Sequence, residues 1–352
     1  MEKKFLKYIK DPQTSVELKL FIFKEEKDNL ISGVLVNPEG QIAFPILHGV
    51  PVLLPFSFPQ DFVTQYKKEL QNINEQFNNK LSFECFEDKY SFSAEWEFHF
   101  NNSLIKTWGW NVEDRFEQFL LETQSSKNEL NDKLILDAGC GNGILTEYIS
   151  SYSGLTIGIY LSDSVFFAEK NRISKNVCFI KGNLQSLPFA DGIFDIIVSN
   201  GVIHHTQNTE SSFYCLSSAV KQGGKLYVWL YSDKGNFKWR IKRKFFDFAR
   251  VIISRLNKKT QFIIVSIFAT ILKILHKNRD KNELRINMYD SLTPRWRHYH
   301  TPEEIAHWYY KSGFGPICLT HFDNKYGFGA YALKTMTDKT PGDNYDNSLI
   351  QP

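Results

Sequence analysis

Short apolar runs of strand length recur through the middle of the chain, and helical patterns separate them. The apolar runs lie at residues 133–136, 155–162, 177–184, 194–200 and 222–228. A helical pattern, Ile144–Ser150, follows the first run. Strands that alternate with helices imply a mostly parallel sheet with right-handed crossovers. The pattern therefore predicts an α/β core.

The amino-terminal part of the chain has a different pattern. Residues 16–23 and 30–36 have strand character, and a turn at Asn37–Gly40 follows them. Residues 62–77 are rich in helix formers, with apolar positions near helical spacing. Asn111 can cap a further helix that runs through Leu120. These patterns predict a small β-rich unit followed by a mainly helical one.

The carboxyl-terminal part contains one helix and a strand pair. Thr301 begins a capping box, with Pro302 at the first helical position and Glu304 three residues after the cap. Residues 317–322 and 329–333 have the pattern of two final strands. The tail that follows is polar, which predicts disorder.

The segment Leu136–Gly143 carries the most specific chemical signal. Its three glycines at alternate positions let the backbone turn tightly and approach a ligand. Asp137 lies just before the turn, where a sheet strand ends and ligands bind in α/β folds. A dinucleotide fingerprint would need glycine where Ile144 or Thr146 stands. A pyrophosphate needs bare amides, whereas Asp137 suits a cationic ligand with an amino group.

This loop resembles motif I of the class I S-adenosylmethionine (SAM)-dependent methyltransferases. The four later apolar runs resemble the second to fifth strands of that family, in the same order, and Leu187-Pro188-Phe189 is typical of it. The resemblance implies a Rossmann-like class I methyltransferase sandwich, with a mostly parallel sheet and an antiparallel carboxyl-terminal hairpin. It also implies SAM as the cofactor, but it does not identify the substrate.

The resemblance assigns the cofactor contacts residue by residue. It places the carboxylate of Asp137 at the SAM amino group and the glycine loop against the methionine moiety and ribose. Asn183 stands where the family has an aspartate for the adenine amino group. The resulting cofactor-binding residues are Asp137, Gly139, Cys140, Gly141, Tyr160, Leu161, Asn183, Leu184 and Asn200.

Tyr160 is a departure from the family pattern. The second strand of the family ends in a carboxylate that takes both ribose hydroxyls, and a phenol cannot replace that two-point contact. Asp163, three residues on, is an alternative ribose ligand. Three interpretations stay open: ordinary SAM binding with compensation, use of a modified SAM or a different reaction, and a non-catalytic domain.

Composition and cysteine use limit the class of protein. The net charge is +3, and the five cysteines are scattered without C-x-x-C spacing, which argues against a disulfide framework. The amino-terminal region resembles the zinc-ribbon-like domain of bacterial methyltransferases. Asp11–Thr14 and Asn37–Gly40 occupy its two cysteine knuckles without any cysteine, so no metal is expected. Reduced thiols favour a cytoplasmic protein.

Charge is concentrated in one segment. From Lys234 to Arg285 there are fifteen lysines and arginines against three acids, so this segment carries +12 and the rest of the chain −9. Its apolar run, Phe262–Leu275, is too short to span a bilayer. The pattern of this segment predicts a basic helical hairpin inserted after the fifth strand. Three roles stay open: a substrate lid, a membrane-peripheral surface for anionic lipid or a lipid-linked substrate, and, least favoured, a nucleic-acid face.

The candidate catalytic residues are histidines. His204 and His205 follow the fourth predicted strand, and His298 belongs to the polar and aromatic group 295–300. A histidine can take a proton near neutral pH, although for the pair His204 and His205 a structural role is the favoured interpretation. Further cleft candidates are Trp229, Tyr231 and Asp290.

The sequence thus predicts transfer of a methyl group from SAM to oxygen or nitrogen of a small-molecule acceptor: a sugar, a lipid-linked molecule or a specialised metabolite. The alternatives are a SAM-dependent reaction other than methyl transfer, such as that of a cyclase or group transferase, and a non-catalytic SAM-binding scaffold. The oligomeric state is undetermined. The predicted regions are 1–56 (degenerate zinc-ribbon-like), 57–131 (helical cap over the cofactor site), 132–231 (SAM-binding core), 232–285 (basic insertion), 286–335 (end of the core) and 336–352 (disordered tail).

Overall fold

The computed structural model describes most of the chain. The described residues are 1–39, 41–55, 57–83, 110–234, 237–275, 277, 280–323, 326–335 and 350–351. The aromatic segment Tyr90–Phe98, expected either to fold over the cofactor or to form a packing cluster, lies outside these residues.

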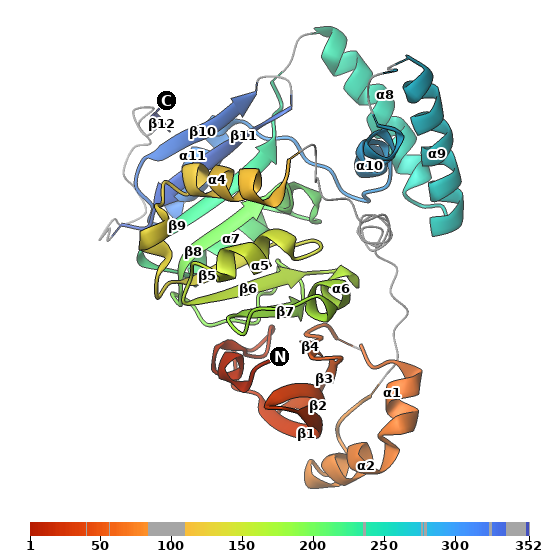
Figure 1. Ribbon diagram of the computed structural model, residues 1–352, viewed down its shortest axis with the longest axis vertical. Coiled ribbons are helices and arrows are strands. Elements are labelled where there is room, and N and C mark those ends of the chain that lie inside the picture. Colours follow the sequence, from red (N-terminus) through yellow and green to blue (C-terminus); the bar gives the residue numbers. More distant parts are fainter. Residues whose placement is uncertain are drawn as a thin grey trace.

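A large sheet forms the centre of the molecule (Figure 1). Within the described residues its order is β12-β10-β11-β9-β8-β5-β6-β7. Strands β9, β8, β5, β6 and β7 run parallel, whereas β11 is antiparallel to both β9 and β10. The predicted mostly parallel sheet with an antiparallel carboxyl-terminal hairpin is therefore confirmed. The strands are β5 (Leu134–Ala138), β6 (Leu155–Tyr160), β7 (Val177–Lys181), β8 (Phe194–Asn200), β9 (Val220–Tyr231), β10 (Ile317–Asp323), β11 (Gly327–Leu333) and β12 (Ile350–Gln351).

Helices cover both faces of this sheet, because alternate strand residues point to opposite sides. On β5, Leu134 and Leu136 belong to one apolar cluster and Ile135 to another. Phe213 packs in the first cluster and Phe116 in the second. The first includes helices α7 (Thr209–Ala219) and α11 (Pro302–Lys311), and the second α4 (Val112–Glu122) and α5 (Ile144–Ser150). The predicted caps of α4 and α11 are present: Asp114 N–H donates to the Asn111 side chain, and Glu304 N–H to that of Thr301.

The amino-terminal region is an antiparallel sheet with two short helices. Its elements are β1 (Lys19–Glu26), β2 (Asn29–Asn37), β3 (Ile42–Leu47), β4 (Val50–Pro51), α1 (Gln60–Gln65) and α2 (Lys67–Gln76). The expected single helix over 62–77 is interrupted at Tyr66, where the backbone leaves the helical region at φ −108° and ψ 27°. That these helices cover the cofactor site stays a prediction. Their apolar residues Phe62 and Leu70 pack against Val34 and Val36 of the small sheet.

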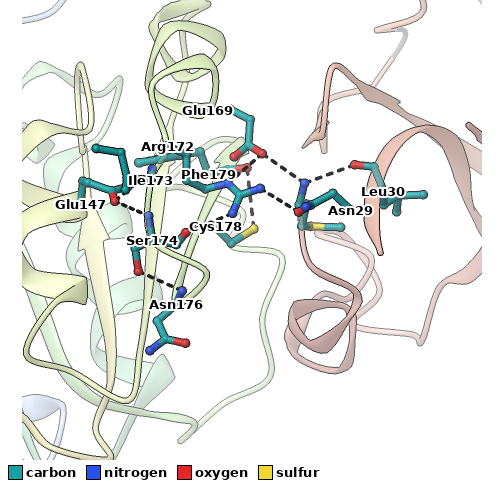
Figure 2. Close-up of polar contacts among 11 residues, drawn as sticks. Asn29, Leu30, Glu147, Glu169, Arg172, Ile173, Ser174, Asn176, Cys178 and Phe179 are labelled. Carbon is teal, nitrogen blue, oxygen red and sulfur yellow. Dashed lines mark hydrogen bonds and ion pairs between the residues drawn. The ribbon is translucent and has the colours of Figure 1, made fainter. Parts of the chain in front are cut away.

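The two sheets are joined through β4 and β7. Leu53 N–H donates to the carbonyl of Lys181 at 2.8 Å. Figure 2 shows a second link, in which Arg172 donates to Glu169 and, across the junction, to Asn29 at 2.8 Å. Residues of both regions, such as Phe44 and Ile180, belong to one apolar cluster. A small sheet of this size thus gains a core from its larger neighbour.

Hydrogen bonds join the two turns that stand in place of zinc knuckles. Asp11 is fully buried, and its carboxylate accepts from the backbone N–H of Gln13 and Thr14. The Asn37 side-chain amide donates to both Asp11, at 2.9 Å, and Thr14, at 3.0 Å. The resemblance of this region to a zinc ribbon stays a prediction, and direct side-chain contact connects the turns here.

Three helices follow β9: α8 (Phe237–Ile253), α9 (Lys258–Leu275) and α10 (Lys281–Leu292). In Figure 1 they form a group beside the large sheet, and α10 packs against both of the others. The predicted boundary at residue 285 falls inside α10, so the insertion extends to Leu292. Buried Leu284 and Tyr289 lie on either side of the predicted boundary, on one continuous helix.

The tail differs in part from the expectation of disorder. Ile350 and Gln351 form β12, which pairs in parallel with β10. The expectation is wrong for these two residues, because their backbone groups extend the edge of the sheet. Residues 336–349 lie outside the described part of the chain.

Candidate functional site

The glycine loop follows β5 and needs its glycines. Gly139, Gly141 and Gly143 have φ values of 110°, 57° and 74°, a region that other residues rarely adopt. A Cβ on Gly139 would lie 2.2 Å from a methyl of Val202, which follows β8. Gly139 N–H also donates to the carbonyl of Ile159 on β6 at 2.9 Å. The loop is thus held between the carboxyl ends of three neighbouring strands.

Asp137, the next-to-last residue of β5, is a buried acid, and the described residues give it one side-chain donor. The Thr146 hydroxyl donates to its Oδ2 at 2.5 Å. Burial raises the pKa of Asp137, while the Thr146 bond and the positive charge of Arg115 oppose that rise. Arg115 lies on α4, and burial lowers the pKa of its guanidinium against the charges of Asp137 and Glu122. The charge of Arg115 thus acts on Asp137, and no salt bridge joins the two residues among the described contacts.

Glu122 is a second buried acid, at the end of α4. Its carboxylate accepts from the side-chain amides of Asn200 at 3.2 Å and Gln118 at 3.2 Å. Burial raises the pKa of Glu122 to about 7, although Tyr227, the Gln118 bond, the charge of Arg115 and the Asn200 bond lower it. Asn200 ends β8, so this contact ties α4 to the strand ends beside the glycine loop.

Stability should depend on pH through Glu122. Its folded-state pKa lies above the ordinary value of 4.5, so its contribution to stability is complete below pH 4.5 and is lost as pH rises through about 7. We expect the Glu122→Gln variant to lack this loss, which amounts to about 3 kcal/mol at most. Urea unfolding at pH 5, 6, 7 and 8 measures the slope. Equal slopes in the two proteins, with exposed Glu117→Gln as the control, would contradict the assignment.

The other predicted cofactor residues differ in exposure. Cys140 and Tyr160 are 8% and 9% exposed and pack with Phe179 and Val165 in an apolar cluster. Leu184 is buried in the main core, while Leu161 is partly exposed. The structure thus places Tyr160 and Cys140 together at the ends of β5 and β6, with their side chains directed mainly into packing.

Two polar positions already have partners within the chain. The Asn183 carbonyl oxygen, expected to face adenine, accepts from Gln185 N–H at 3.0 Å. The Asp163 carboxylate, the alternative ribose ligand, accepts from Lys181 at 2.6 Å. Lys181 ends β7 next to Tyr160 in the strand register. Lys181 thus places a positive charge beside the strand end where the family has a carboxylate. The sequence pattern did not indicate this ion pair.

His204 lies in an aromatic enclosure. Its side chain is 0% exposed, and both ring nitrogens lack a hydrogen-bond partner among the described residues. Its ring centre is 4.1 Å from that of Tyr231 and 4.3 Å from that of His205. Burial, with the nearby His205 and Arg297, holds the pKa of His204 well below its ordinary value. A catalytic role for His204 stays a prediction, and its full burial favours a structural role.

His205 is the histidine with an oriented ring. Its Nδ1 lies 3.0 Å from the Trp296 carbonyl oxygen, and its Nε2 lies 3.6 Å from Asp290 Oδ1. The other oxygen of Asp290 accepts from the Tyr231 hydroxyl at 2.7 Å. Burial lowers the pKa of His205 to about 4 despite the charge of Asp290, so the imidazole is neutral at pH 7. With Nδ1–H donating to the Trp296 carbonyl, Nε2 is the nitrogen that can accept a proton, and it lies on the Asp290 side of the ring.

The segment 295–300 runs alongside these histidines. His298 N–H donates to the His204 carbonyl, and its Nε2 lies 3.1 Å from the Thr206 carbonyl oxygen. Arg297 lies 4.2 Å from the centre of the Tyr231 ring. The predicted group therefore lies beside His205, but His298 is engaged with backbone there. Arg115 and Glu122 were not predicted; the available signal was charged positions beside Phe116 and Phe119 on α4.

Comparison with known proteins adds an independent observation. Residues 136–228 match the family model described as "Methyltransferase domain". The match begins at the end of β5 and ends within β9, so it contains the glycine loop and the two histidines after β8.

Several curated proteins are similar over this part of the chain. A putative methyltransferase of Invertebrate iridescent virus 6 is 35% identical over 127 residues, which cover 34% of this chain and 47% of that protein. The sterol 24-C-methyltransferase of Kluyveromyces lactis is 25% identical over 48% of this chain and 46% of that protein. An O-methyltransferase of ubiquinone biosynthesis from Coxiella burnetii is 27% identical over 28% of this chain and 43% of that protein. The chain thus spans less than half the length of these relatives.

Among solved structures, magnesium protoporphyrin IX methyltransferase from Synechocystis covers 78% of this chain, at 14% identity and a TM-score of 0.38. So low a score adds nothing to the argument. The sequence match and the strand order observed here are independent of it. Residues 136–228 of this chain thus match a methyltransferase domain.

Proposed function

We propose that this protein is a SAM-dependent methyltransferase with a small-molecule acceptor. The observation that carries the proposal is the buried carboxylate of Asp137 beside the glycine loop, on which the charge of Arg115 acts. SAM has an ammonium and a carboxylate on its methionine end. The Asp137 carboxylate would accept from the ammonium, and the Arg115 guanidinium would donate to the carboxylate. The residues present therefore fit this cofactor.

The chain itself would contribute alignment and proton transfer. SAM supplies an electrophilic methyl group, and in-line displacement depends chiefly on holding the nucleophile in position. His205, neutral at pH 7, would take the proton from an oxygen or nitrogen nucleophile. Asp290 would position the imidazole and stabilise its protonated form. His204 and His298 would have packing and backbone roles in this arrangement.

Loss of the proposed base should lower turnover without loss of the cofactor. We expect His205→Gln to reduce kcat by a factor of about 100 to 10,000, the range for a general base. The dissociation constant for SAM should not change. His307→Gln on α11, outside this cluster, is the control. Unchanged kcat in His205→Gln would remove His205 from the reaction.

The acceptor class is a further part of the proposal. Oxygen and nitrogen nucleophiles of sugars, specialised metabolites or lipid-linked molecules fit a neutral base beside Trp229 and Tyr231. Relatives named for sterol methylation and ubiquinone biosynthesis favour an apolar acceptor. The basic insertion would then lie on the acceptor side of the sheet, since Asp290 of α10 contacts Tyr231.

A second function is favoured by one observation. The position of the ribose-binding carboxylate holds Tyr160, and Lys181 and Asp163 form an ion pair beside it. A modified SAM, or a reaction at another carbon of SAM, would be consistent with this altered edge.

Product analysis tests the proposed reaction. The full chain is incubated with methyl-labelled SAM and a panel of phenols, sugars, amines and lipid-linked acceptors. S-adenosylhomocysteine together with a labelled acceptor supports methyl transfer. Methylthioadenosine, or SAM bound without any turnover across the panel, would favour the alternatives.

A further inference from the structure

Helices α8 and α9 expose an unusual amount of apolar side chain. The α9 residues Ile263, Ile267 and Ile271 are 58%, 55% and 49% exposed. Their spacing of four residues puts them on one face of the helix. On α8, Phe245 and Phe248 are 67% and 68% exposed. Single exposed apolar residues are common, but such a continuous face marks an interaction surface.

This face also contains a shallow hollow. It has a volume of about 400 Å³ and is lined by α9 residues from Phe262 to Ile271. The opposite side of α9 supplies the buried residues Val265 and Ala269. The α10 helix packs against both α8 and α9, whereas Ile263, Ile267 and Ile271 on the other side of α9 stay exposed.

The insertion is fixed to the rest of the protein through polar contacts. On α8, Arg250 donates to the carbonyls of Pro294 and Arg295, and Asp247 accepts from the Tyr299 hydroxyl. On α10, Asp290 accepts from Tyr231. The outer face of α8 and α9 is therefore presented by an anchored group of helices.

Basic residues lie at the ends of the apolar face. Arg255 lies in the turn between α8 and α9, Lys258 and Lys259 begin α9, and all three are exposed. Lys277, also exposed, lies just after α9. Between Lys234 and Arg285 the chain carries a net charge of +12. Apolar residues flanked by lysine and arginine are the pattern of helices that lie in the surface of an anionic bilayer.

We infer that α8 and α9 bind the surface of an anionic lipid bilayer, with their apolar faces at the level of the headgroups. Charge decides between this partner and a second copy of the chain. Two copies would bring two strongly positive surfaces together, whereas anionic lipid neutralises them. The described helices include none that is long and apolar enough to cross a membrane. The inference concerns this surface and does not depend on the proposed methyl transfer.

Vesicle flotation tests the inference on the full chain. Vesicles of phosphatidylcholine alone are compared with vesicles containing 30% phosphatidylglycerol (about one anionic lipid in three), at low and high salt. We expect flotation with anionic vesicles at low salt and much less at high salt. Lys258→Glu with Lys259→Glu should weaken binding by at least about thirtyfold. The matched control is Lys67→Glu with Lys68→Glu, the two exposed lysines that begin α2.

A second pair of variants tests the apolar contact. Ile267→Ser with Ile271→Ser should weaken flotation, while Leu121→Ser with Ile173→Ser, which are even more exposed but lie elsewhere, should not. Both pairs replace exposed side chains, and unchanged circular dichroism confirms that they fold. Failure to float on anionic vesicles at low salt would overturn the inference. So would a dimer in solution that the Ile267 and Ile271 changes dissociate.

Discussion

Replacement of Asp137 by asparagine should weaken SAM binding at least about tenfold, which is about 1.4 kcal/mol. Asparagine keeps the size of the side chain and can still accept from Thr146. It removes the negative charge that would face the ammonium and balance Arg115. The expected loss is therefore electrostatic, and isothermal titration with SAM measures it.

Asp195→Asn is the matched control for this change. Asp195 accepts from Leu134 N–H and pairs with Lys221 at the opposite ends of β5 and β8. Its loss should cost stability and leave the SAM dissociation constant unchanged. If Asp137→Asn and Asp195→Asn bind SAM as tightly as the parent chain, the glycine loop is not the cofactor site.

The second large effect is expected at Gly139. A methyl group there would meet Val202 at 2.2 Å, and the φ of 110° is unfavourable for alanine. We expect Gly139→Ala to lower the free energy of unfolding by about 3 kcal/mol and to abolish SAM binding. Urea unfolding and titration with SAM measure the two effects.

Two further variants separate backbone strain from the clash. Gly192 has a φ of 64°, and a Cβ there would meet nothing within 4 Å, so Gly192→Ala should cost only about 1 kcal/mol. The double variant Gly139→Ala with Val202→Ala should recover part of the loss. Equal costs at Gly139 and Gly192 would show that the contact with Val202 is unimportant.

The core of the fold could be predicted because its strands are buried on both faces. The fourth apolar run, 194–200, coincides with β8, and the final strand pair matches β10 and β11 closely. Such strands are continuous runs of apolar residues, which a sequence shows directly. The caps at Asn111 and Thr301 were equally visible, because capping depends on residues only three positions apart.

The packing of α1 and α2 and the partners of the site residues could not be predicted, because they depend on contacts between distant parts of the chain. The apolar stripe of α1 and α2 is plain in the sequence, but nothing local shows that it packs on the small sheet. Arg115 meets the charge of Asp137 only after α4 packs on the large sheet. Asp290 is recognisable as a partner of His205 only once α10 lies against the end of β9.

The roles of the two adjacent histidines in the candidate site could not be predicted from the sequence either. The sequence places His204 and His205 together after β8, and both were candidates for a base. Their neighbours differ: His204 is enclosed by aromatic rings, whereas His205 faces Asp290. Adjacent residues of a short 3₁₀ turn point in different directions, so spacing alone could not separate their roles.

Titration of the unmodified chain with SAM and S-adenosylhomocysteine tests the central claim most directly. Binding at the glycine loop predicts one saturable site for each chain, shared by the two ligands, so that either displaces the other. It also predicts that binding disappears on Gly139→Ala and persists on Gly192→Ala. Absence of binding for both ligands in the folded parent chain would contradict the account.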